Sequence, residues 1–312
     1  MGVIDMKTAF LFPGQGAQFV GMGRDFYEHY PEGKNVFEQA ESVLGSNFLD
    51  MIFEGPESSL QMTENTQPAI LTVSVAIYQV LEKHFNLKPE GMAGLSLGEY
   101  SALVAAGALS FKDALPLVQK RGIFMQETVS AGEGLMTAIM GLDHEKVEEI
   151  CREAASEGLV SPANYNCPGQ IVISGNKAAV QFAAKLAREA GAKKVTELKV
   201  SAPFHCALLE PVEARLSDQL EQIKVNKPKV PVVFNVSARV ESDPACIKNN
   251  LVNQVSNPIL WEQSIRKLIE LGVDTFVGLG PGNSLSRLMK RIAPEYKTYA
   301  VETIEDVDQI VD

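Results

Sequence analysis

The segment that most constrains the fold is a short apolar stretch that leads into a serine-containing turn and then into an alanine-rich helix. Lys88–Ala93 can form only a short strand, the pentapeptide GLSLG of residues 94–98 follows it, and Glu99–Leu109 has the composition of a helix. The order of strand, tight turn and helix is typical of α/β folds with a parallel sheet. The small alanine side chains let the helix lie close to that sheet.

The pentapeptide fits the pattern G-x-S-x-G of a nucleophile elbow, in which a sharp turn between a strand and a helix exposes a serine hydroxyl. Small residues beside the serine tolerate the strained backbone of such a turn. An ordinary glycine-rich turn is the alternative, and the flanking strand and helix favour the elbow. Ser96 is therefore the candidate nucleophile.

A serine nucleophile needs a general base, and the chain has four histidines. His29 and His84 close helical segments, and His144 lies in a charged first helical turn, so we expect these three on the solvated surface. His205 differs because it follows a proline in an apolar segment. A core histidine is the alternative, but the serine elbow in the same chain favours His205 as the base.

Arg121 is a charged residue on an apolar helical face. At helical spacing it shares that face with Leu117, Val118, Phe124 and Met125. A charge in this position needs a partner. The partner is either an internal acidic residue or the carboxylate of a substrate, which a guanidinium can bind through two parallel hydrogen bonds.

The turn after the first expected strand could supply a backbone N–H group to the reaction. Thr8–Phe12 is an apolar run, and Pro13–Gly16 ends it as a glycine-rich turn. Elbow enzymes bind a developing oxyanion with the N–H of the residue after the serine and an N–H from a loop after a neighbouring strand. Leu97 and Gln15 could supply that pair.

The middle of the chain has the element order β-α-β-β-α-β of a ferredoxin-like unit. The elements that we expect there are, in order, Leu135–Met140, Asp143–Glu157, Val160–Asn166, Gln170–Ser174, Lys177–Gly191 and Lys193–Val200. A chain of 312 residues is long enough for two domains. We therefore predict a large α/β-hydrolase-like domain with a parallel sheet (1–130 and 200–312) and an inserted small ferredoxin-like domain (131–199).

The rest of the large domain follows from apolar periodicity. We expect further buried strands at Val230–Val236 and Thr275–Leu279. Helices are expected at Met22–Gly45, Gln67–Phe85, Glu210–Ile223, Trp261–Leu271 and Ser284–Ile292.

Composition excludes several functional classes. The net charge of −11 disfavours nucleic acid as a partner. No apolar run reaches the length of a membrane span, and the start of the chain does not resemble a secretory signal, so we expect a cytoplasmic protein without a membrane partner. The four cysteines and four histidines lack metal-ligand spacing, so we expect neither a metal site nor a disulfide framework.

Six short motifs carry a resemblance to a known family. They are FPGQGAQ (12–18), GLSLGEYS (94–101), QKRG (119–122), NYNCPGQ (164–170), PFH (203–205) and GPGN (280–283). In this order they resemble the malonyl-CoA:acyl carrier protein transacylases of bacterial fatty acid synthesis, over nearly the whole chain. The resemblance implies transfer of a malonyl group from malonyl-CoA to the phosphopantetheine thiol of acyl carrier protein, with no cofactor.

The resemblance also implies roles for the candidate residues. Ser96 would be acylated, His205 would be its general base, and the backbone N–H groups of Gln15 and Leu97 would form the oxyanion hole. Arg121 resembles the arginine that binds the malonyl carboxylate. Both fatty acid and polyketide carrier proteins stay open as acceptors.

Further positions carry over from the family in the same way. Gln254, in the motif NQVSNP, resembles the residue whose main-chain carbonyl orients the base. Asn166 and Gln170 match a motif that lines the cleft, and Phe204 resembles a residue of malonyl-selective relatives that restricts branched acyl groups. Leu95 departs from the family, which usually has histidine before the nucleophile, and this affects fine tuning rather than the base.

Two alternatives use the same residues differently. A serine esterase or thioesterase would keep the elbow and use water as the second nucleophile, but it has no need of a buried cation. A non-catalytic carrier-binding protein would keep the cleft without the chemistry. For docking of an acidic carrier we expect a local basic patch at one of two clusters: Lys193, Lys194 and Lys199, or Arg287, Lys290 and Arg291.

Overall fold

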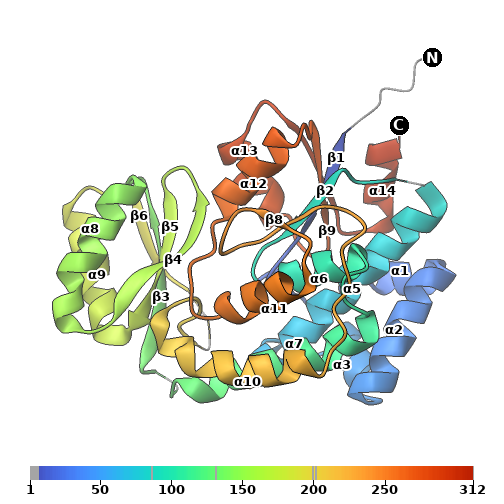
Figure 1. Cartoon of the computed structure of the whole chain (residues 1–312), viewed down its shortest axis with the longest axis horizontal. Helices are drawn as coiled ribbons and strands as arrows, with labels where there is room; N and C mark the ends of the chain where they lie inside the picture. Colours follow the sequence, from blue (N-terminus) through green and yellow to red (C-terminus); the bar gives the residue numbers. More distant parts are fainter. Residues whose placement is uncertain (1–6, 86, 131, 199, 201, 312) are drawn as a thin grey trace.

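The computed structural model describes residues 7–85, 87–130, 132–198, 200 and 202–311. In the described chain the strands form two sheets that lie apart in the molecule (Figure 1). Lys199 and residues 131 and 201, which lie at the expected domain junctions, fall outside the described residues, as do residues 1–6 and 312.

The larger sheet has six strands in the order β10-β9-β1-β2-β7-β8. Neighbouring strands are parallel except β7 and β8, which are antiparallel. The strands are β1 (Thr8–Phe12), β2 (Gly91–Gly94), β7 (Val232–Val233), β8 (Val240–Glu241), β9 (Thr275–Leu279) and β10 (Lys297–Val301). The expected parallel sheet is confirmed.

Both faces of this sheet are buried. In β1 the side chains of Phe10 and Phe12 enter one apolar core, and those of Ala9 and Leu11 enter another on the opposite face. This alternation follows from the two-residue period of a strand. A parallel sheet covered on both faces needs the continuous apolar strands that this sequence has.

Helices fill the two faces unequally. The second core takes its apolar residues from α12 (Trp261–Glu270) and α13 (Ser284–Ile292). The first core is larger. Its helices are α1 (Arg24–His29), α2 (Pro31–Leu44), α3 (Phe48–Phe53), α4 (Glu57–Leu60), α5 (Thr63–Phe85), α6 (Gly98–Ala105), α7 (Phe111–Thr128), α10 (Glu210–Glu221), α11 (Pro244–Asn253) and α14 (Ile304–Val311).

The smaller sheet is antiparallel, with the order β4-β5-β3-β6. Its elements are β3 (Gly134–Met140), α8 (His144–Ala154), the 3-10 turn η1 (Ala155–Glu157), β4 (Val160–Cys167), β5 (Gln170–Asn176), α9 (Lys177–Glu189) and β6 (Lys194–Glu197). Helices α8 and α9 pack on the sheet around a third apolar core of their own. The side chain of Asp143 caps α8 by accepting a hydrogen bond from the Lys146 N–H.

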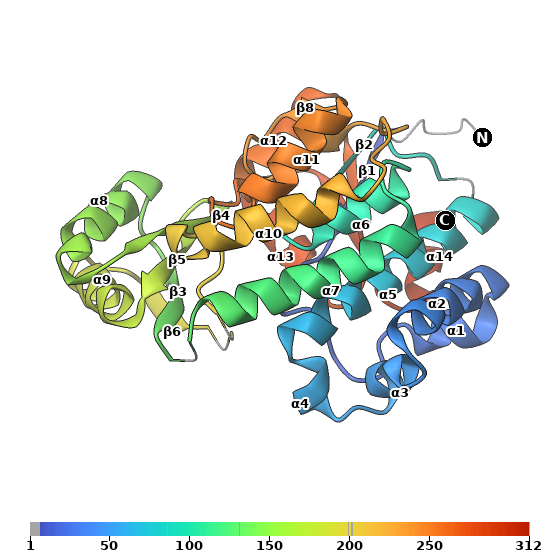
Figure 2. The same ribbon diagram turned by 60° about the horizontal axis from the view of Figure 1, so that its bottom comes forward.

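Backbone hydrogen bonds join the two parts. The Tyr165 N–H of β4 donates to the Ile259 carbonyl, and the Ile259 N–H donates to the Ala163 carbonyl, both at 2.9 Å. Helices α7 and α10 lie side by side and extend towards the smaller sheet (Figure 2). The 3-10 turn η2 (Ala207–Leu209) leads back into α10. The smaller sheet is therefore held directly beside the larger part.

Several element boundaries differ from the sequence prediction. The helix expected over Met22–Gly45 is two helices, because Tyr30 is extended before Pro31, which starts α2. The helix expected from Gln67 begins at Thr63. The strand expected over Val230–Val236 pairs only at Val232–Val233, and the helix after Gly98 ends at Ala105, before the left-handed Gly107.

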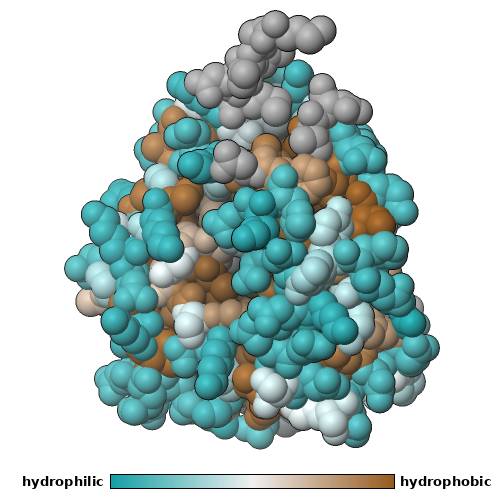
Figure 3. Space-filling model, turned by 90° about the vertical axis from the view of Figure 1, so that its right-hand side faces the viewer, coloured by the Kyte–Doolittle hydropathy of each residue, from teal (hydrophilic) through white to brown (hydrophobic). Residues whose placement is uncertain are grey.

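No helix among the described residues is long and apolar enough to cross a membrane. Figure 3 shows one side of the surface, where hydrophilic residues predominate and hydrophobic residues form smaller areas between them.

Candidate active site

The turn between β2 and α6 holds Ser96 in a left-handed backbone conformation, with φ of 53°. The glycines on either side permit this turn. A Cβ on Gly94 would lie 1.9 Å from the carbonyl carbon of Gly98, and a Cβ on Gly98 would lie 2.1 Å from the carbonyl oxygen of Phe12. The strand and the helix therefore approach more closely than any side chain would allow, and the serine is exposed to the pocket.

His205 lies against the serine. Its Nε2 is 2.7 Å from Ser96 Oγ, and its Nδ1 is 2.7 Å from the main-chain oxygen of Gln254. A carbonyl oxygen can only accept, so Nδ1 carries the proton and Nε2 is free to accept from the serine hydroxyl. The arrangement is that of a nucleophile, a base and a group that orients the base.

The environment of His205 keeps it neutral. The side chain is 3% exposed. Burial lowers the pKa of His205 to about 3, the positive charge of Arg121 adds to this lowering, and the hydrogen bond to the Gln254 carbonyl opposes it. A neutral imidazole is the form that can take a proton from serine.

Arg121 is 1% exposed and extends from α7 towards the serine. Its guanidinium donates to Gln67 Oε1 and Gln254 Oε1, both at 2.9 Å, and its Nη2 is 3.3 Å from Ser96 Oγ. None of the ion pairs formed by described residues includes Arg121. Neutral amides thus hold the cation, and no carboxylate in the described part of the chain lies within ion-pair distance of it.

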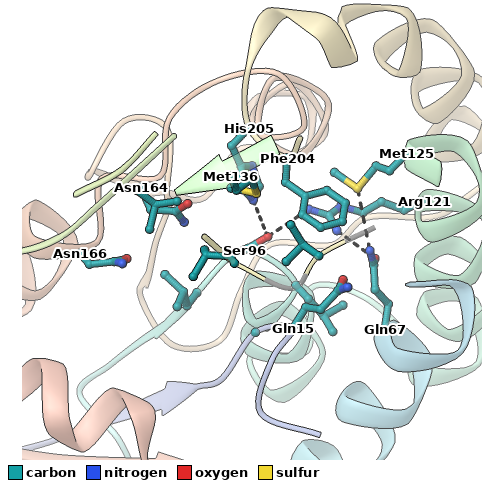
Figure 4. A pocket seen from close by; sticks show the side chains of 16 residues that line it. Gln15, Gln67, Ser96, Arg121, Met125, Met136, Asn164, Asn166, Phe204 and His205 are labelled. Atoms are coloured by element: carbon teal, nitrogen blue, oxygen red, sulfur yellow. Dashed lines mark hydrogen bonds between the residues drawn. The ribbon is translucent and has the colours of Figure 1, made fainter. Parts of the chain in front are cut away.

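A pocket of about 180 Å³ opens above the serine, and Figure 4 shows its lining side chains. The polar lining includes Ser96, His205 and Arg121, and the apolar lining includes Met125, Met136, Val172, Leu198 and Phe204. A few polar groups within an apolar wall are typical of a small-molecule site.

Gln15 and Leu97 both line this pocket. The turn that carries Gln15 lies close to the elbow, since a Cβ on Gly14 would be 2.4 Å from the Leu95 carbonyl oxygen. Within the described chain, neither the Gln15 nor the Leu97 backbone N–H donates to a protein acceptor. Both are thus available to a ligand in the pocket.

Of the remaining candidates, three line the pocket and one does not. Phe204 lines it, and so does Asn166, whose side-chain oxygen is buried without a partner. Leu95 is also part of the lining. Gln170 is not, because its Oε1 accepts a hydrogen bond from Arg291 at 2.7 Å, and the expectation that it lines the cleft was wrong.

The other histidines lie away from the serine. His29 and His84 are exposed, as expected. His144 is only partly exposed, because its ring packs edge-on against Tyr165 and its Nε2 lies 3.7 Å from Glu262 Oε2. The expectation of a solvated His144 was therefore wrong, since Tyr165 of β4 and Glu262 of α12 cover part of it.

Four polar residues of the site were missed from the sequence. Gln67 holds Arg121, Glu99 is fully buried behind the elbow, and Asn235 forms hydrogen bonds with the elbow itself. Asn164 also lines the pocket. Gln67 could have been found because it is an amide directly before the apolar run of α5, whereas nothing in the sequence near Asn235 points to residues 94–96.

Residues from both of the expected basic clusters lie around one hollow of the surface. Lys193 and Lys194 of the smaller part and Arg291 of α13 line one surface hollow beside Pro168 and Gly169. Arg287 and Lys290 do not line it. Arg291 also donates to the Pro168 carbonyl at 2.8 Å, so it links the two parts of the molecule.

The described residues contain no group of three or more histidine, cysteine, aspartate or glutamate side chains that could hold a metal. The four cysteines are free thiols; Cys151, Cys167 and Cys206 are buried and Cys246 is exposed.

Comparisons with known proteins cover almost the whole chain. A family model described as an acyl transferase domain matches residues 9–305. The malonyl CoA-acyl carrier protein transacylase of Bacillus subtilis (strain 168) is 48% identical over 303 residues, which are 97% of this chain and 95% of that protein.

Solved structures agree with these sequence matches. The malonyl CoA-acyl carrier protein transacylase of Coxiella burnetii has a TM-score of 0.97 at 40% identity and covers 100% of this chain and 98% of its own. A malonyl-transacylase in complex with a holo type II PKS acyl-carrier protein has a TM-score of 0.96 at 42% identity, covering 98% of this chain and 99% of its own.

Proposed function

The chain belongs to the acyl transferase family, as a malonyl-CoA:acyl carrier protein transacylase, and we propose that Ser96, His205 and Arg121 carry its reaction. The enzyme transfers a malonyl group from malonyl-CoA to acyl carrier protein. The observation that supports these roles best is the unbroken chain from Ser96 Oγ through His205 to the Gln254 carbonyl.

In the first half-reaction Ser96 Oγ attacks the thioester carbonyl of malonyl-CoA while His205 Nε2 takes the hydroxyl proton. The tetrahedral oxyanion accepts hydrogen bonds from the Gln15 and Leu97 N–H groups. The bond to sulfur then breaks, and His205 returns the proton to the coenzyme A thiolate. The product is a malonyl ester on Ser96.

In the second half-reaction the phosphopantetheine thiol of the carrier attacks that ester. His205 takes the thiol proton and returns it to Ser96 Oγ as the ester bond breaks. The same oxyanion hole serves both steps, so the reaction is a ping-pong transfer. The Gln254 carbonyl keeps the imidazole in the tautomer that both steps need.

Arg121 selects the acyl group. A cation that neutral amides hold at the serine is suited to a carboxylate, which it can bind through two parallel hydrogen bonds. Phe204 and Asn166 lie in the same pocket and are proposed to shape the acyl and pantetheine binding regions.

We also propose a finer description of the architecture. The order of β3 to β6, the antiparallel pairing and the separate core support a ferredoxin-like domain over residues 131–199. The parallel sheet with its serine elbow supports an α/β-hydrolase-like large domain from residues 1–130 and 200–312. A cytoplasmic location, fatty acid biosynthesis as the pathway and the absence of a cofactor complete the proposal.

The test is the intact mass of the protein after mixing with malonyl-CoA. The wild type should gain one malonyl group, and Ser96→Ala should gain none, because Ser96 is the serine on the elbow. A full-size adduct on folded Ser96→Ala would overturn the assignment. A serine esterase or thioesterase would instead release free malonate as fast with water as with the carrier thiol.

A further inference from the structure

Asn235 lies directly beside the nucleophile, although the chain separates the two by 139 residues. Strand β7 pairs in parallel with β2, with Met92 opposite Val232 and Ala93 opposite Val233. Continuing that register past both strand ends brings Asn235 alongside the elbow. The side chain is fully buried.

The amide of Asn235 binds both ends of the strained turn. Its Oδ1 accepts from the Ser96 N–H at 2.8 Å, and its Nδ2 donates to the Gly94 carbonyl at 2.8 Å. An amide is the small side chain that offers a donor and an acceptor together. These two bonds span the residues whose backbone must hold Ser96 at positive φ.

The same amide reaches the group that orients the base. Gln254 Nε2 donates to Asn235 Oδ1 at 3.2 Å and to the Ser96 carbonyl at 3.0 Å. The backbone of Asn235 is itself fixed, since its N–H donates to Glu99 Oε2 at 2.6 Å and its carbonyl accepts from the Leu260 N–H at 2.8 Å. Asn235 thus connects the nucleophile turn to the segment that holds His205.

We propose that Asn235 is a positioning residue, which clamps the elbow at residues 94–96 and sets the direction of Ser96 Oγ towards His205. This inference rests on the proposed function, because it assumes that Ser96 is the nucleophile. Asn235 does not line the pocket and acts through the turn rather than on the substrate.

The experiment measures the reactivity of Ser96 with a probe that has no malonyl carboxylate and so does not need Arg121. A fluorophosphonate forms a phosphorus bond to Ser96 Oγ with loss of fluoride, while His205 accepts the hydroxyl proton. Asn235→Ala should slow this labelling by about 10- to 100-fold, the scale expected when a reacting group is displaced by about 1 Å. The maximal rate of malonylation should fall by a similar factor, and half-saturation by malonyl-CoA should change less than about twofold, because Arg121 stays in place.

Phe234→Leu is the matched control. Phe234 is also fully buried at the end of β7, but its side chain makes no hydrogen bond to the turn. It should lower the melting temperature and leave the labelling rate near that of the wild type. Equal labelling of Asn235→Ala and Phe234→Leu would overturn the clamp and leave Asn235 a packing residue.

The variant Asn235→Asp tests the two hydrogen bonds separately. It keeps an acceptor for the Ser96 N–H but has no donor for the Gly94 carbonyl when ionised. We expect a labelling rate between those of the wild type and Asn235→Ala. If Asn235→Ala does not fold, labelling of Asn235→Asp at the rate of Phe234→Leu overturns the proposal. Malonylation of Ser96→Ala would instead refute the proposed function, whatever the Asn235 variants do.

Discussion

Ser96 and His205 share a left-handed backbone, with φ of 53° and 59°. Such conformations cost non-glycine residues on the order of 1–3 kcal/mol each and persist only where the surroundings enforce them. Gln254 is the residue that contacts both, through its side chain to the Ser96 carbonyl and through its carbonyl to His205. The fold therefore holds the proposed nucleophile and base in place before substrate arrives.

At the scale of single residues, Arg121 gives a prediction about substrate choice. Arg121→Ala should lower kcat/KM for malonyl-CoA by about 10- to 150-fold, since it removes a charge-assisted contact of about 1.5–3 kcal/mol. Acetyl-CoA has no carboxylate and should lose little. Arg121→Lys should restore only part of the activity, because a point charge cannot reproduce the guanidinium fork.

The readout is the ratio of malonyl to acetyl transfer, measured on proteins with normal thermal transitions. Lys120→Ala is the control, because it removes an exposed cation from the adjacent position of the same helix. An unchanged ratio with both activities lost would mean that Arg121 only supports Gln67 and Gln254.

The sequence predicts residues whose chemistry is visible locally and misses those that distant chain segments bring in. Ser96 was found from its own pentapeptide, and Arg121 from its place on an apolar helical face. Asn235 has no such local signal, because its role depends on the register between β7 and β2. Gln254 could be placed only through the family resemblance.

At the scale of elements, the junction of β2 and α6 depends on close backbone approach. Gly94, Gly98 and Gly14 each lack room for a Cβ, as the nucleophile elbow requires. The sequence predicted this junction because glycine spacing encodes it. The ends of other elements depend on tertiary pairing. The strand expected over Val230–Val236 therefore pairs at only two residues, and α11, α14 and β10 were not predicted.

Helix α6 also carries a buried acid in its first turn. Burial raises the pKa of Glu99 from its ordinary value of 4.5 to about 8, against the opposing effects of the Asn235 N–H and Arg121. The folded protein thus keeps a proton that the unfolded chain releases between these two pH values. The contribution of Glu99 to stability is fully present below pH 4.5 and is lost as the pH rises through about 8.

The variant Glu99→Gln tests whether the contribution of Glu99 to stability falls as the pH rises. Glutamine keeps an oxygen for the Asn235 N–H and cannot ionise, so the melting temperature of the variant relative to wild type should rise between about pH 5 and about pH 9. Thermal unfolding at several pH values measures the difference. A difference that is constant with pH would show that Glu99 is ionised in the folded protein throughout.

At the scale of the whole molecule, the pocket lies between the larger and the smaller part and is lined by residues of both. Ser96, Leu97 and Arg121 come from the larger part, whereas Asn164 and Asn166 come from β4 of the smaller part. Backbone bonds at Ile259 and the contacts of Arg291 fix the smaller part in place. The width of the pocket therefore depends on this junction, which no single segment of the sequence encodes.

Carrier docking is the prediction that belongs to this scale. The chain has a net charge of −11, so an acidic carrier cannot be attracted by the molecule as a whole and needs a local basic surface. The hollow lined by Lys193, Lys194 and Arg291 is the candidate, because it joins residues from both expected clusters. Arg291 also holds Gln170, so the two lysines make the cleaner test.

The double change Lys193→Glu and Lys194→Glu should raise the KM for the carrier by about fivefold or more, because charge complementarity mainly governs encounter. The defect should become smaller as salt increases, since ions screen exposed charges. The rate of Ser96 malonylation by malonyl-CoA should not change. Lys112→Glu, at the end of α7 away from the smaller sheet, is the control for a simple change in net charge. If both variants raise the KM for the carrier equally, overall charge rather than this hollow governs docking.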